Sequence, residues 1–420
     1  MTKSSMRKRA LLVGAGENRG IGELGRLAGT LGLETVGSLE QGRRDGTGYL
    51  GRGKREELAR LVGVLKADLV VTDDELSASQ ARVLEKAAKV PVVDRTALII
   101  RIFEAHARDA ASRLEVELAE LTYRLPRIKG RNPALSRLGG GVGTRGPGEQ
   151  QLEYDRRAIR ERMGRIRKRL GEENAARKVR GARLKEQGPP SVTLVGYTNA
   201  GKTTILNALS GENRSTADRL FETLETTTRL VAGTTGNGEG GARPDFVLTD
   251  TVGLIRKLPT QLVHSFASTL EATKGTDVIV LCADASSEKL EEEIRIAEDV
   301  LAETLSRNDG IGSRQKTILC LNKSDLISDE RRGELAASYP DAVLISARLD
   351  ASPLLDAINE ALAQSRIRMR ILIPHAEYGV VSDLYGRAEI HARENTAEGL
   401  RLDVTLSKPQ ARRYARYRIS

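Results

Sequence analysis

A glycine-rich segment near the middle of the chain has the residue types and spacing of a phosphate-binding loop. Residues 196–203 match the pattern G-x-x-x-x-G-K-[ST], and an apolar run, residues 191–195, comes directly before them. Such a loop turns backbone N–H groups toward a phosphate, and the positive end of the following helix adds to the attraction. We expect Lys202 to reach the outer phosphates of a nucleoside triphosphate and the Thr203 hydroxyl to bind Mg²⁺.

A second segment supplies groups that such a loop needs beside it. Asp250 ends an apolar run that starts at Phe246, and Gly253 follows three residues later. The carboxylate helps to hold Mg²⁺, usually through water, and the Gly253 N–H can contact the γ-phosphate. The next residue is Leu254, where a Ras-like enzyme has the glutamine that orients the attacking water. Because leucine cannot orient water, we expect slow intrinsic hydrolysis, with the missing group supplied from elsewhere in the protein or by a partner.

Base-recognition residues follow two further apolar runs. Asn322-Lys323-Ser324-Asp325 comes after residues 316–321, and Ser346-Ala347 comes after residues 343–345. The Asp325 carboxylate can accept two hydrogen bonds from the N1–H and N2–H₂ edge of guanine, whereas adenine offers no such pair of donors. The sequence therefore predicts a guanine nucleotide, with Ser346 and Ala347 supporting the base from its O6 side.

A threonine between these segments is expected to complete the magnesium site. Segment 221–229 contains Thr223, Thr227 and Thr228, and we choose Thr223 because it lies 21 residues beyond Lys202, nearer the usual span. It would bind Mg²⁺ and respond to the γ-phosphate, and the other two threonines remain alternatives. The predicted catalytic residues are Lys202, Thr203, Thr223, Asp250 and Gly253, and the predicted metal ligands are Thr203 and Thr223. The predicted GTP contacts are Gly196, Tyr197, Thr198, Asn199, Ala200, Gly201, Lys202, Thr203, Thr204, Phe221, Glu222, Thr223, Leu224, Glu225, Asp250, Thr251, Val252, Gly253, Asn322, Lys323, Ser324, Asp325, Ser346, Ala347 and Arg348.

Residues 1–95 predict a small parallel α/β unit, because short apolar runs alternate there with helical patterns. The expected strands are 11–13, 35–36, 68–71 and 90–93, and the expected helices are 22–31, 54–65 and 77–88. Gly14-Ala15-Gly16 followed by Gly20 is faintly similar to a dinucleotide-binding fingerprint, but the spacing is wrong.

Residues 96–187 predict a helical hairpin. Apolar residues at three- and four-residue steps predict one long amphipathic helix over 96–125, which Pro126 ends, and a second helix over about 151–185. The loop between them has six glycines from Gly139 to Gly148, and residues 151–187 contain 13 Lys and Arg against 6 Asp and Glu. If the charge were the only observation, a basic helix exposed to solvent would be enough to explain it. A glycine- and arginine-rich tip on the same hairpin instead favours contact with RNA phosphates.

Composition limits the remaining function classes. The 420 residues are enough for about two to four domains, and 67 Lys and Arg against 57 Asp and Glu give a net charge of +10 that favours an acidic partner. Aromatic residues make up 3%, so base stacking is not the obvious mode of binding. Cys282 and Cys320 lie in apolar runs and are expected to be buried thiols, which fits a reducing cytosol. No apolar run approaches the roughly 20 residues of a membrane span, so we expect a cytoplasmic protein.

The predicted fold class is α/β, with several domains. We expect an N-terminal α/β unit at 1–95 and a long helical hairpin at 96–187, with its tip loop at about 127–150. Residues 188–365 are expected to form a P-loop domain with a mostly parallel sheet and helices on both faces. A small α+β module is expected at 366–420.

Several longer sequence segments, spread along nearly the whole chain, resemble the HflX family of translation-factor-related GTPases. They are residues 138–149, 155–157, 196–204, 221–224 and 250–259, with 51–54 and 94–96 in the N-terminal part. Gln150 departs from the family pattern, which usually has threonine there, and Thr203 stands where serine is commoner. The first difference bears on local contacts only, and either hydroxyl at 203 can serve Mg²⁺.

The resemblance implies a GTPase that hydrolyses GTP to GDP with Mg²⁺ and binds the large ribosomal subunit and its rRNA. In the family the hairpin tip reaches toward the peptidyl-transferase centre, and the GTP-bound form splits stalled or idle ribosomes. The RNA-contacting residues implied are Arg137, Gly141, Gly143, Thr144, Arg145, Gly146, Arg156 and Arg157. The family is also associated with ATP at the N-terminal domain. We expect a monomer with no stable membrane anchor and with a fraction on ribosomes or membranes.

Two other hypotheses about the function remain open. The first is a large-subunit assembly factor or RNA chaperone that uses GTP as a binding latch. The second is a GTPase linked to tRNA modification or to membranes, which the lack of an obvious amphipathic anchor or cysteine cluster counts against.

Overall fold

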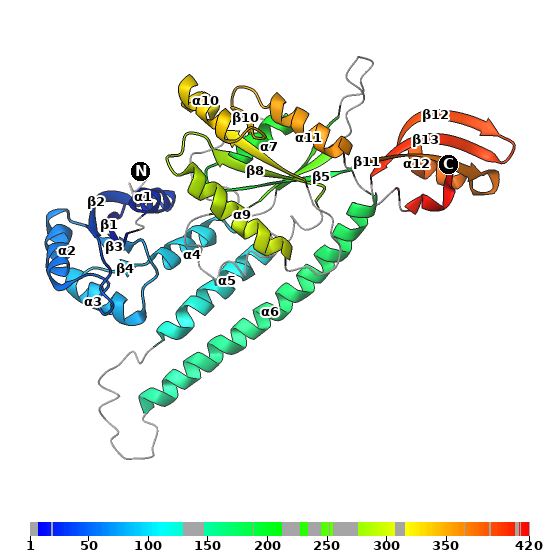
Figure 1. Cartoon of the computed structure of the whole chain (residues 1–420). Helices are drawn as coiled ribbons and strands as arrows, with labels where there is room; N and C mark the ends of the chain where they lie inside the picture. The colour runs from blue at the N-terminus through cyan, green and yellow to red at the C-terminus, as the bar shows by residue number, and fades with distance from the viewer. Residues whose placement is uncertain are drawn as a thin grey trace, which may run out of the picture. The chain divides into compact units, whose positions relative to one another are not determined.

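The computed structural model describes residues 7–17, 20–128, 147–187, 189–211, 227–233, 245–251, 253–254, 276–306, 316–364, 366–385, 388–407, 411 and 413–419. These residues form three β-sheets with helices packed against them (Figure 1). They fall into two compact units, one up to Glu173 and one from Asn174 onward. Among the described residues, no helix is both long and apolar enough to span a membrane.

The N-terminal sheet confirms the predicted parallel α/β unit. All its strands are parallel, in the order β2-β1-β3-β4, and the two inner strands, β1 and β3, are almost fully buried. The strands are β1 (Arg9–Ala15), β2 (Glu34–Gln41), β3 (Leu69–Thr72) and β4 (Val92–Val93). The helices are α1 (Ile21–Thr30), α2 (Arg52–Val64) and α3 (Ala78–Ala88). Ser77 and Gln80 form a reciprocal capping box that starts α3.

The single long helix predicted for 96–125 is wrong, because two helices occupy this segment. Helix α4 (Arg95–His106) ends at Ala107, whose backbone is extended, and α5 (Ala110–Arg124) starts after it. The Asp109 carboxylate caps α5 by accepting a hydrogen bond of 2.6 Å from the Ser112 N–H. Helix α4 contacts α1 and β3, so it packs with the N-terminal sheet. The apolar spacing concealed the break because both helices bury one face.

The hairpin is formed by α5 and α6 (Pro147–Gln187), which lie side by side in Figure 1. The apolar residues between them are Ala111, Leu114, Leu118, Leu121, Ile166 and Leu170. Arg162 adds a two-pronged ion pair to Glu117, with N–O distances of 2.7 and 3.1 Å. Residues 147–150, predicted as part of the tip loop, belong to α6; proline is favoured in the first turn of a helix, where its missing N–H costs nothing. A short 3₁₀ turn, η1 (Leu125–Arg127), follows α5.

The third segment contains the predicted P-loop sheet, in the order β10-β9-β8-β5-β7-β6, parallel except for β6. The strands are β5 (Ser191–Gly196), β6 (Thr227–Val231), β7 (Phe246–Asp250), β8 (Val278–Asp284), β9 (Lys316–Asn322) and β10 (Val343–Leu344). The helices are α7 (Lys202–Ser210), α9 (Leu290–Ser306), α10 (Asp329–Ser338) and α11 (Ser352–Gln364), with the 3₁₀ turn η3 (Ser324–Leu326).

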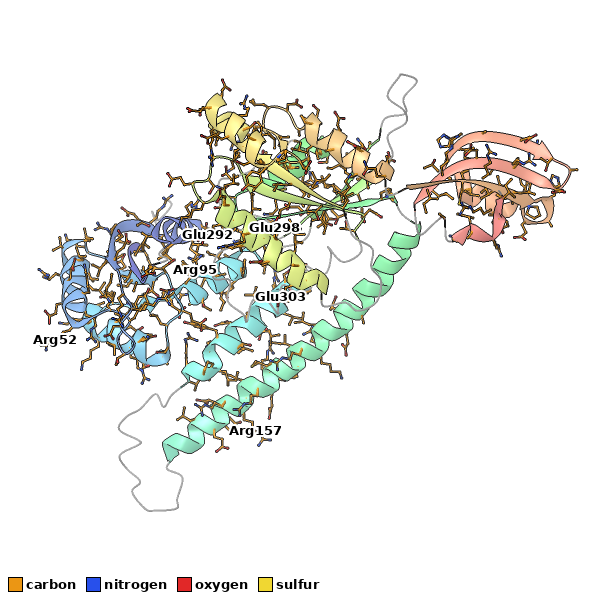
Figure 2. All side chains as sticks on the ribbon, in the orientation of Figure 1. Arg52, Arg95, Arg157, Glu292, Glu298 and Glu303 are labelled. Atoms are coloured by element: carbon orange, nitrogen blue, oxygen red, sulfur yellow. The ribbon has the colours of Figure 1, made fainter. Side chains whose placement is uncertain are left out.

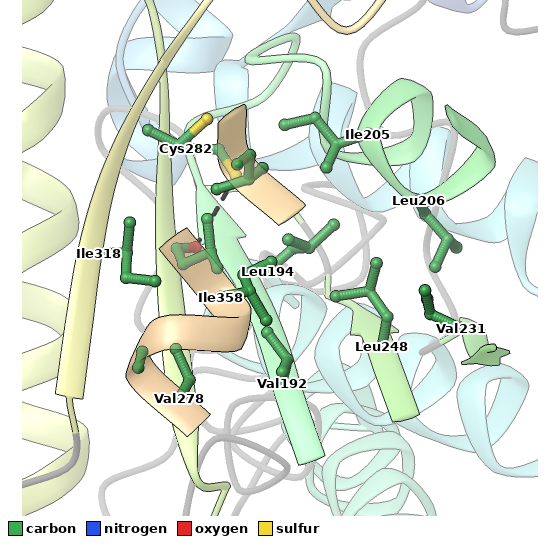
Figure 3. Close-up of a cluster of buried hydrophobic side chains, with 14 of the residues drawn as sticks. Val192, Leu194, Ile205, Leu206, Val231, Leu248, Val278, Cys282, Ile318 and Ile358 are labelled. Atoms are coloured by element: carbon green, nitrogen blue, oxygen red, sulfur yellow. Dashed lines mark hydrogen bonds between the residues drawn. The ribbon is translucent and has the colours of Figure 1, made fainter. Parts of the chain in front are cut away.

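Helices cover both faces of this sheet because its strands are apolar on both sides. Val192 and Leu194 of β5 point to the face covered by α7 and α11 (Figure 3), where Ile205 and Ile358 meet them. Val195 points to the opposite face, where α9 packs. Strands buried on both faces are typical of parallel sheets between two helical layers.

The last sheet is antiparallel, in the order β12-β13-β11-β14. Its elements are β11 (Arg366–Pro374), η4 (His375–Glu377), α12 (Gly379–Tyr385), β12 (Glu389–Thr396), β13 (Gly399–Ser407), η5 (Ala415–Tyr417) and β14 (Arg418–Ile419). Alternate residues of β13 are buried under α12 and the segment containing Tyr414 and Tyr417. This is the predicted α+β module, with the strand order of a split β-α-β arrangement.

Candidate nucleotide and active site

The phosphate-binding loop lies between β5 and α7, as predicted. Gly201 has a left-handed backbone (φ 86°) and precedes α7, where a Cβ would stand 2.2 Å from Asn322 Nδ2. A Cβ on Gly196 would stand 2.0 Å from the Cys282 carbonyl oxygen. Both positions therefore require glycine, which explains why the loop can lie so close to strands β8 and β9.

Lys202 is folded back onto its own loop. Its ammonium donates hydrogen bonds to the carbonyl oxygens of Gly196 and Tyr197, at 3.1 and 3.0 Å. Burial lowers the pKa of Lys202, and the nearby Asp250 carboxylate opposes that shift. A buried ammonium is stabilised more by an anion than by neutral carbonyl oxygens. A phosphate in the loop would therefore compete favourably with the Gly196 and Tyr197 carbonyl oxygens for the Lys202 ammonium.

The predicted magnesium ligand Thr203 meets Asp250 directly. The Thr203 hydroxyl donates a hydrogen bond of 2.8 Å to the fully buried Asp250 carboxylate. Hydroxyl and carboxylate oxygens are the ligand types that Mg²⁺ prefers, so this pair fits the ion. The Thr251 hydroxyl donates to the Leu194 carbonyl oxygen at 2.7 Å and fixes the segment after β7. Thr223, the other predicted ligand, lies outside the described residues, as do Phe221, Glu222, Leu224, Glu225 and Val252.

Gly253 and Leu254 lie against the phosphate-binding loop. The Leu254 N–H donates to the Gly196 carbonyl oxygen at 3.0 Å, and the Leu254 carbonyl oxygen accepts from the Thr198 N–H at 2.7 Å. The Leu254 side chain is buried in the apolar cluster that contains Tyr197. Leu254 therefore holds the loop through its backbone, and its side chain cannot orient a water.

Asn322 connects the phosphate end of the site to the base end. This 2% exposed side chain donates from Nδ2 to the Ala200 carbonyl oxygen and accepts at Oδ1 from the Ala347 N–H, both at 2.9 Å. Ser346 is also buried, and within the described part of the chain its hydroxyl has no hydrogen-bond partner. A polar atom placed this way fits the predicted contact with the guanine O6.

The base-recognition loop is held by an ion pair that the sequence did not predict. Lys323 has a left-handed backbone (φ 66°), and its ammonium lies 2.7 Å from the Asp284 carboxylate. Asp284 ends β8 directly opposite Asn322. An aspartate at the end of an apolar run, beside another strand end, was the signal that could have identified it. Asp325 and Arg348 are exposed, so a ligand can reach both side chains.

The predicted RNA contacts are only partly described. Arg157 projects from α6 (Figure 2), is 79% exposed and pairs with Glu161 at 3.0 Å. Arg156 is half-buried and donates to the Ile128 carbonyl oxygen at 3.3 Å, which gives it a structural partner. The other predicted contacts lie outside the described residues: Arg137, Gly141, Gly143, Thr144, Arg145 and Gly146.

The N-terminal sheet offers little to a phosphate at its β1–α1 turn. The Gly20 N–H, at the start of α1, donates to the Asp73 carboxylate at 2.8 Å. Asp73 also binds the fully buried Arg95 at 2.8 Å, and Arg95 lies 3.1 Å from Glu23. ATP binding in this region stays a prediction, and a carboxylate at the helix N-terminus disfavours it at this turn.

Comparisons with known proteins agree with this geometry. Residues 18–104 match the family model described as GTP-binding GTPase N-terminal, residues 106–183 the GTP-binding GTPase middle region, and residues 191–323 the 50S ribosome-binding GTPase. The first two matches meet in the last turn of α4, just before the break between α4 and α5.

Individual relatives cover most of the chain. GTPase HflX of Caldanaerobacter subterraneus subsp. tengcongensis is 39% identical over 383 residues, which are 90% of this chain and 86% of that protein. GTPase HflX of Escherichia coli is 35% identical over 342 residues, 80% of this chain and 77% of that protein. A solved GTP-binding protein from Sulfolobus solfataricus in complex with GDP is 20% identical, with 85% of this chain and 98% of that chain covered and a TM-score of 0.42. The chain therefore belongs to the HflX family and is a GTPase.

Proposed function

We propose that this GTPase binds the large ribosomal subunit and its rRNA through the α5–α6 hairpin and, in its GTP-bound form, splits stalled or idle ribosomes. The observation that carries the proposal is the exposed basic surface of α6. The description of the family matched by residues 191–323, a 50S ribosome-binding GTPase, supports it.

The exposed side of α6 between Arg157 and Arg169 is strongly basic, which supports contact with a polyanion. Met163, Ile166 and Leu170 are buried, so packing accounts for one side of the helix. The exposed basic residues along the same segment, apart from Arg162, which pairs with Glu117 of α5, are Arg157, Arg160, Arg165, Arg167, Lys168 and Arg169. Arginine and lysine that neutralise backbone phosphates release counterions, which gives strong but salt-sensitive binding to RNA. A basic surface of this kind has no role in the core of the hairpin.

We also propose Mg²⁺ as the cofactor, held by Thr203 with Asp250 beside it and by Thr223. The ion would neutralise charge on the β- and γ-phosphates when bound. Lys202 would then exchange its carbonyl partners for phosphate oxygens, and Asn322 would keep the two ends of the site in register. The site of action would be the cytoplasm, where ribosomes are.

The test is GTP turnover measured with and without purified ribosomes and large subunits, together with ribosome splitting on sucrose gradients. A double variant, Arg165→Glu with Lys168→Glu, reverses charge on exposed positions of α6, and Arg295→Glu, a single charge reversal on the exposed side of α9, is the control. We expect ribosomes to stimulate the wild type and the control, and the α6 variant to lose stimulation and splitting.

Other outcomes separate the proposal from the assembly-factor reading. Tight binding to immature large subunits without splitting of complete ribosomes would favour an assembly factor or RNA chaperone. If the wild-type protein neither bound ribosomes nor hydrolysed GTP faster with them, both hypotheses would be contradicted, and only the GTPase activity would stand.

A further inference from the structure

Thr198 has a buried hydroxyl in the middle of the phosphate-binding loop. The residue is only 7% exposed, and within the described part of the chain its Oγ1 atom has no hydrogen-bond partner. Its backbone N–H is already bonded to the Leu254 carbonyl oxygen. The side chain is therefore not needed to close the loop onto its neighbours.

An unpartnered buried hydroxyl is a cost to the folded protein. Burying such a group without a hydrogen bond costs about 1–3 kcal/mol in proteins. Valine would keep the same branched shape and the same methyl contacts without that cost. The hydroxyl is therefore better explained by a partner that arrives with the substrate than by packing.

The Thr198 side chain lies beside two groups that are expected to contact the γ-phosphate, with its methyl group toward Gly253. A Cβ on Gly253 would stand 2.6 Å from Thr198 Cγ2 and 3.2 Å from the Lys202 ammonium. Gly253 and Lys202 are both predicted to contact the γ-phosphate. Thr198 thus shares one small region with both of them.

The same region lacks the usual water-positioning side chain. Leu254 follows Gly253, and its side chain is buried in the apolar cluster on the other side of the loop. A group that orients the attacking water must come from another residue, and Thr198 already lies against the Gly253 backbone.

We infer that the Thr198 hydroxyl positions the attacking water of GTP hydrolysis in place of the missing glutamine. It accepts a hydrogen bond from the water and donates one to a γ-phosphate oxygen. The water oxygen forms a bond to the γ-phosphorus, and the bond from that phosphorus to the β–γ bridging oxygen breaks, with the electron pair leaving on GDP. The proton of the water goes to the released phosphate or to solvent, so the threonine itself gains and loses none.

The experiment compares Thr198→Val, which removes the hydroxyl and keeps the shape, with Thr198→Ser, which keeps the hydroxyl. Thr276→Val is the matched control, because Thr276 is buried and its hydroxyl donates to the Ser191 carbonyl oxygen at 2.9 Å. Intrinsic single-turnover GTP hydrolysis, GDP affinity and thermal unfolding are measured for each variant with Mg²⁺ and without ribosomes. The result therefore does not depend on the ribosomal proposal.

We expect Thr198→Val to hydrolyse GTP about 10- to 100-fold more slowly, with GDP affinity and unfolding temperature at least equal to wild type. Thr198→Ser and Thr276→Val should keep most of the rate. The inference is overturned if Thr198→Val hydrolyses at the wild-type rate, if Thr198→Ser is as slow as Thr198→Val, or if GDP affinity falls as much as the rate. Should Thr198→Val not fold, Thr198→Ala compared with Thr198→Ser gives the same decision.

Discussion

Replacing Asn322 by alanine tests whether one side chain holds the two ends of the nucleotide site together. The substitution leaves the Ala200 carbonyl oxygen and the Ala347 N–H without the partner that each has at 2.9 Å. A buried backbone group that loses its hydrogen bond costs about 1–3 kcal/mol, so the two together cost about 2–6 kcal/mol. Part of this free energy appears as lost stability, because both groups lie in the folded domain without a nucleotide.

The rest appears as lost nucleotide affinity. GTP and GDP must contact the phosphate-binding loop and the Ser346–Ala347 segment at once, and without Asn322 the ligand must order the two relative to each other. We expect at least about 1.4 kcal/mol of the cost to fall on binding, which is a tenfold higher Kd. The assays are titration with a fluorescent GDP analogue and thermal unfolding, where the Tm should fall by about 4 °C or more.

The matched control is Asn207→Ala in the same domain. Asn207 is 8% exposed and accepts a hydrogen bond of 3.0 Å from Arg229, between α7 and β6. Its loss should lower the Tm but change the Kd for GDP by less than about threefold. The reasoning is refuted if Asn322→Ala binds GDP as tightly as this control does, since the bridge would then have no role in holding the site.

Three further substitutions probe the site. Gly253→Ala places a Cβ 2.8 Å from the Thr198 Cα, so the segment must move; single-turnover hydrolysis should fall at least about tenfold while GDP affinity changes little. Asp325→Asn should weaken GTP binding about 100-fold or more and improve xanthosine triphosphate binding, measured by competition, because an amide complements the N1–H and 2-carbonyl edge of xanthine. Leu254→Gln buries an amide in the apolar cluster, so the Tm should fall and hydrolysis should not accelerate. The first prediction is contradicted if Gly253→Ala hydrolyses GTP at the wild-type rate. The second is contradicted if Asp325→Asn keeps the wild-type base preference, and the third if Leu254→Gln hydrolyses GTP faster than wild type.

Most of the nucleotide domain could be predicted from the sequence because each motif is local. A phosphate-binding loop requires a strand before Gly196 and a helix after Lys202, and the structure has β5 and α7 there. Asp250 and Asn322 each end a strand, so the parallel order brought them to one edge. These predictions required only the residues adjacent in the sequence and the rule that the carboxyl ends of parallel strands lie at the same edge of a sheet.

What the sequence could not provide were contacts between segments. The break between α4 and α5 depends on Asp109, whose capping role is invisible beneath a continuous apolar spacing. The pairing of Asp284 with Lys323 depends on the register between β8 and β9, and the bridge made by Asn322 joins the loop after β5 to the segment after β10. The unpartnered hydroxyl of Thr198 could not be seen at all, because a loop residue in a motif gives no sign of what its side chain meets.

The N-terminal sheet and the P-loop sheet differ in what surrounds an aspartate near the start of a helix. In each, an aspartate from a neighbouring strand lies beside the start of a helix: Asp73 at α1 and Asp250 at α7. Asp73 accepts from the Gly20 N–H and binds Arg95, a cation that belongs to the protein and is itself fully buried. Asp250 instead accepts from the Thr203 hydroxyl, a group that can share a metal ion with it. A magnesium nucleotide can therefore join the second pair, whereas at the first it would have to separate Asp73 from Arg95, which would leave the buried guanidinium with Glu23 as a carboxylate partner.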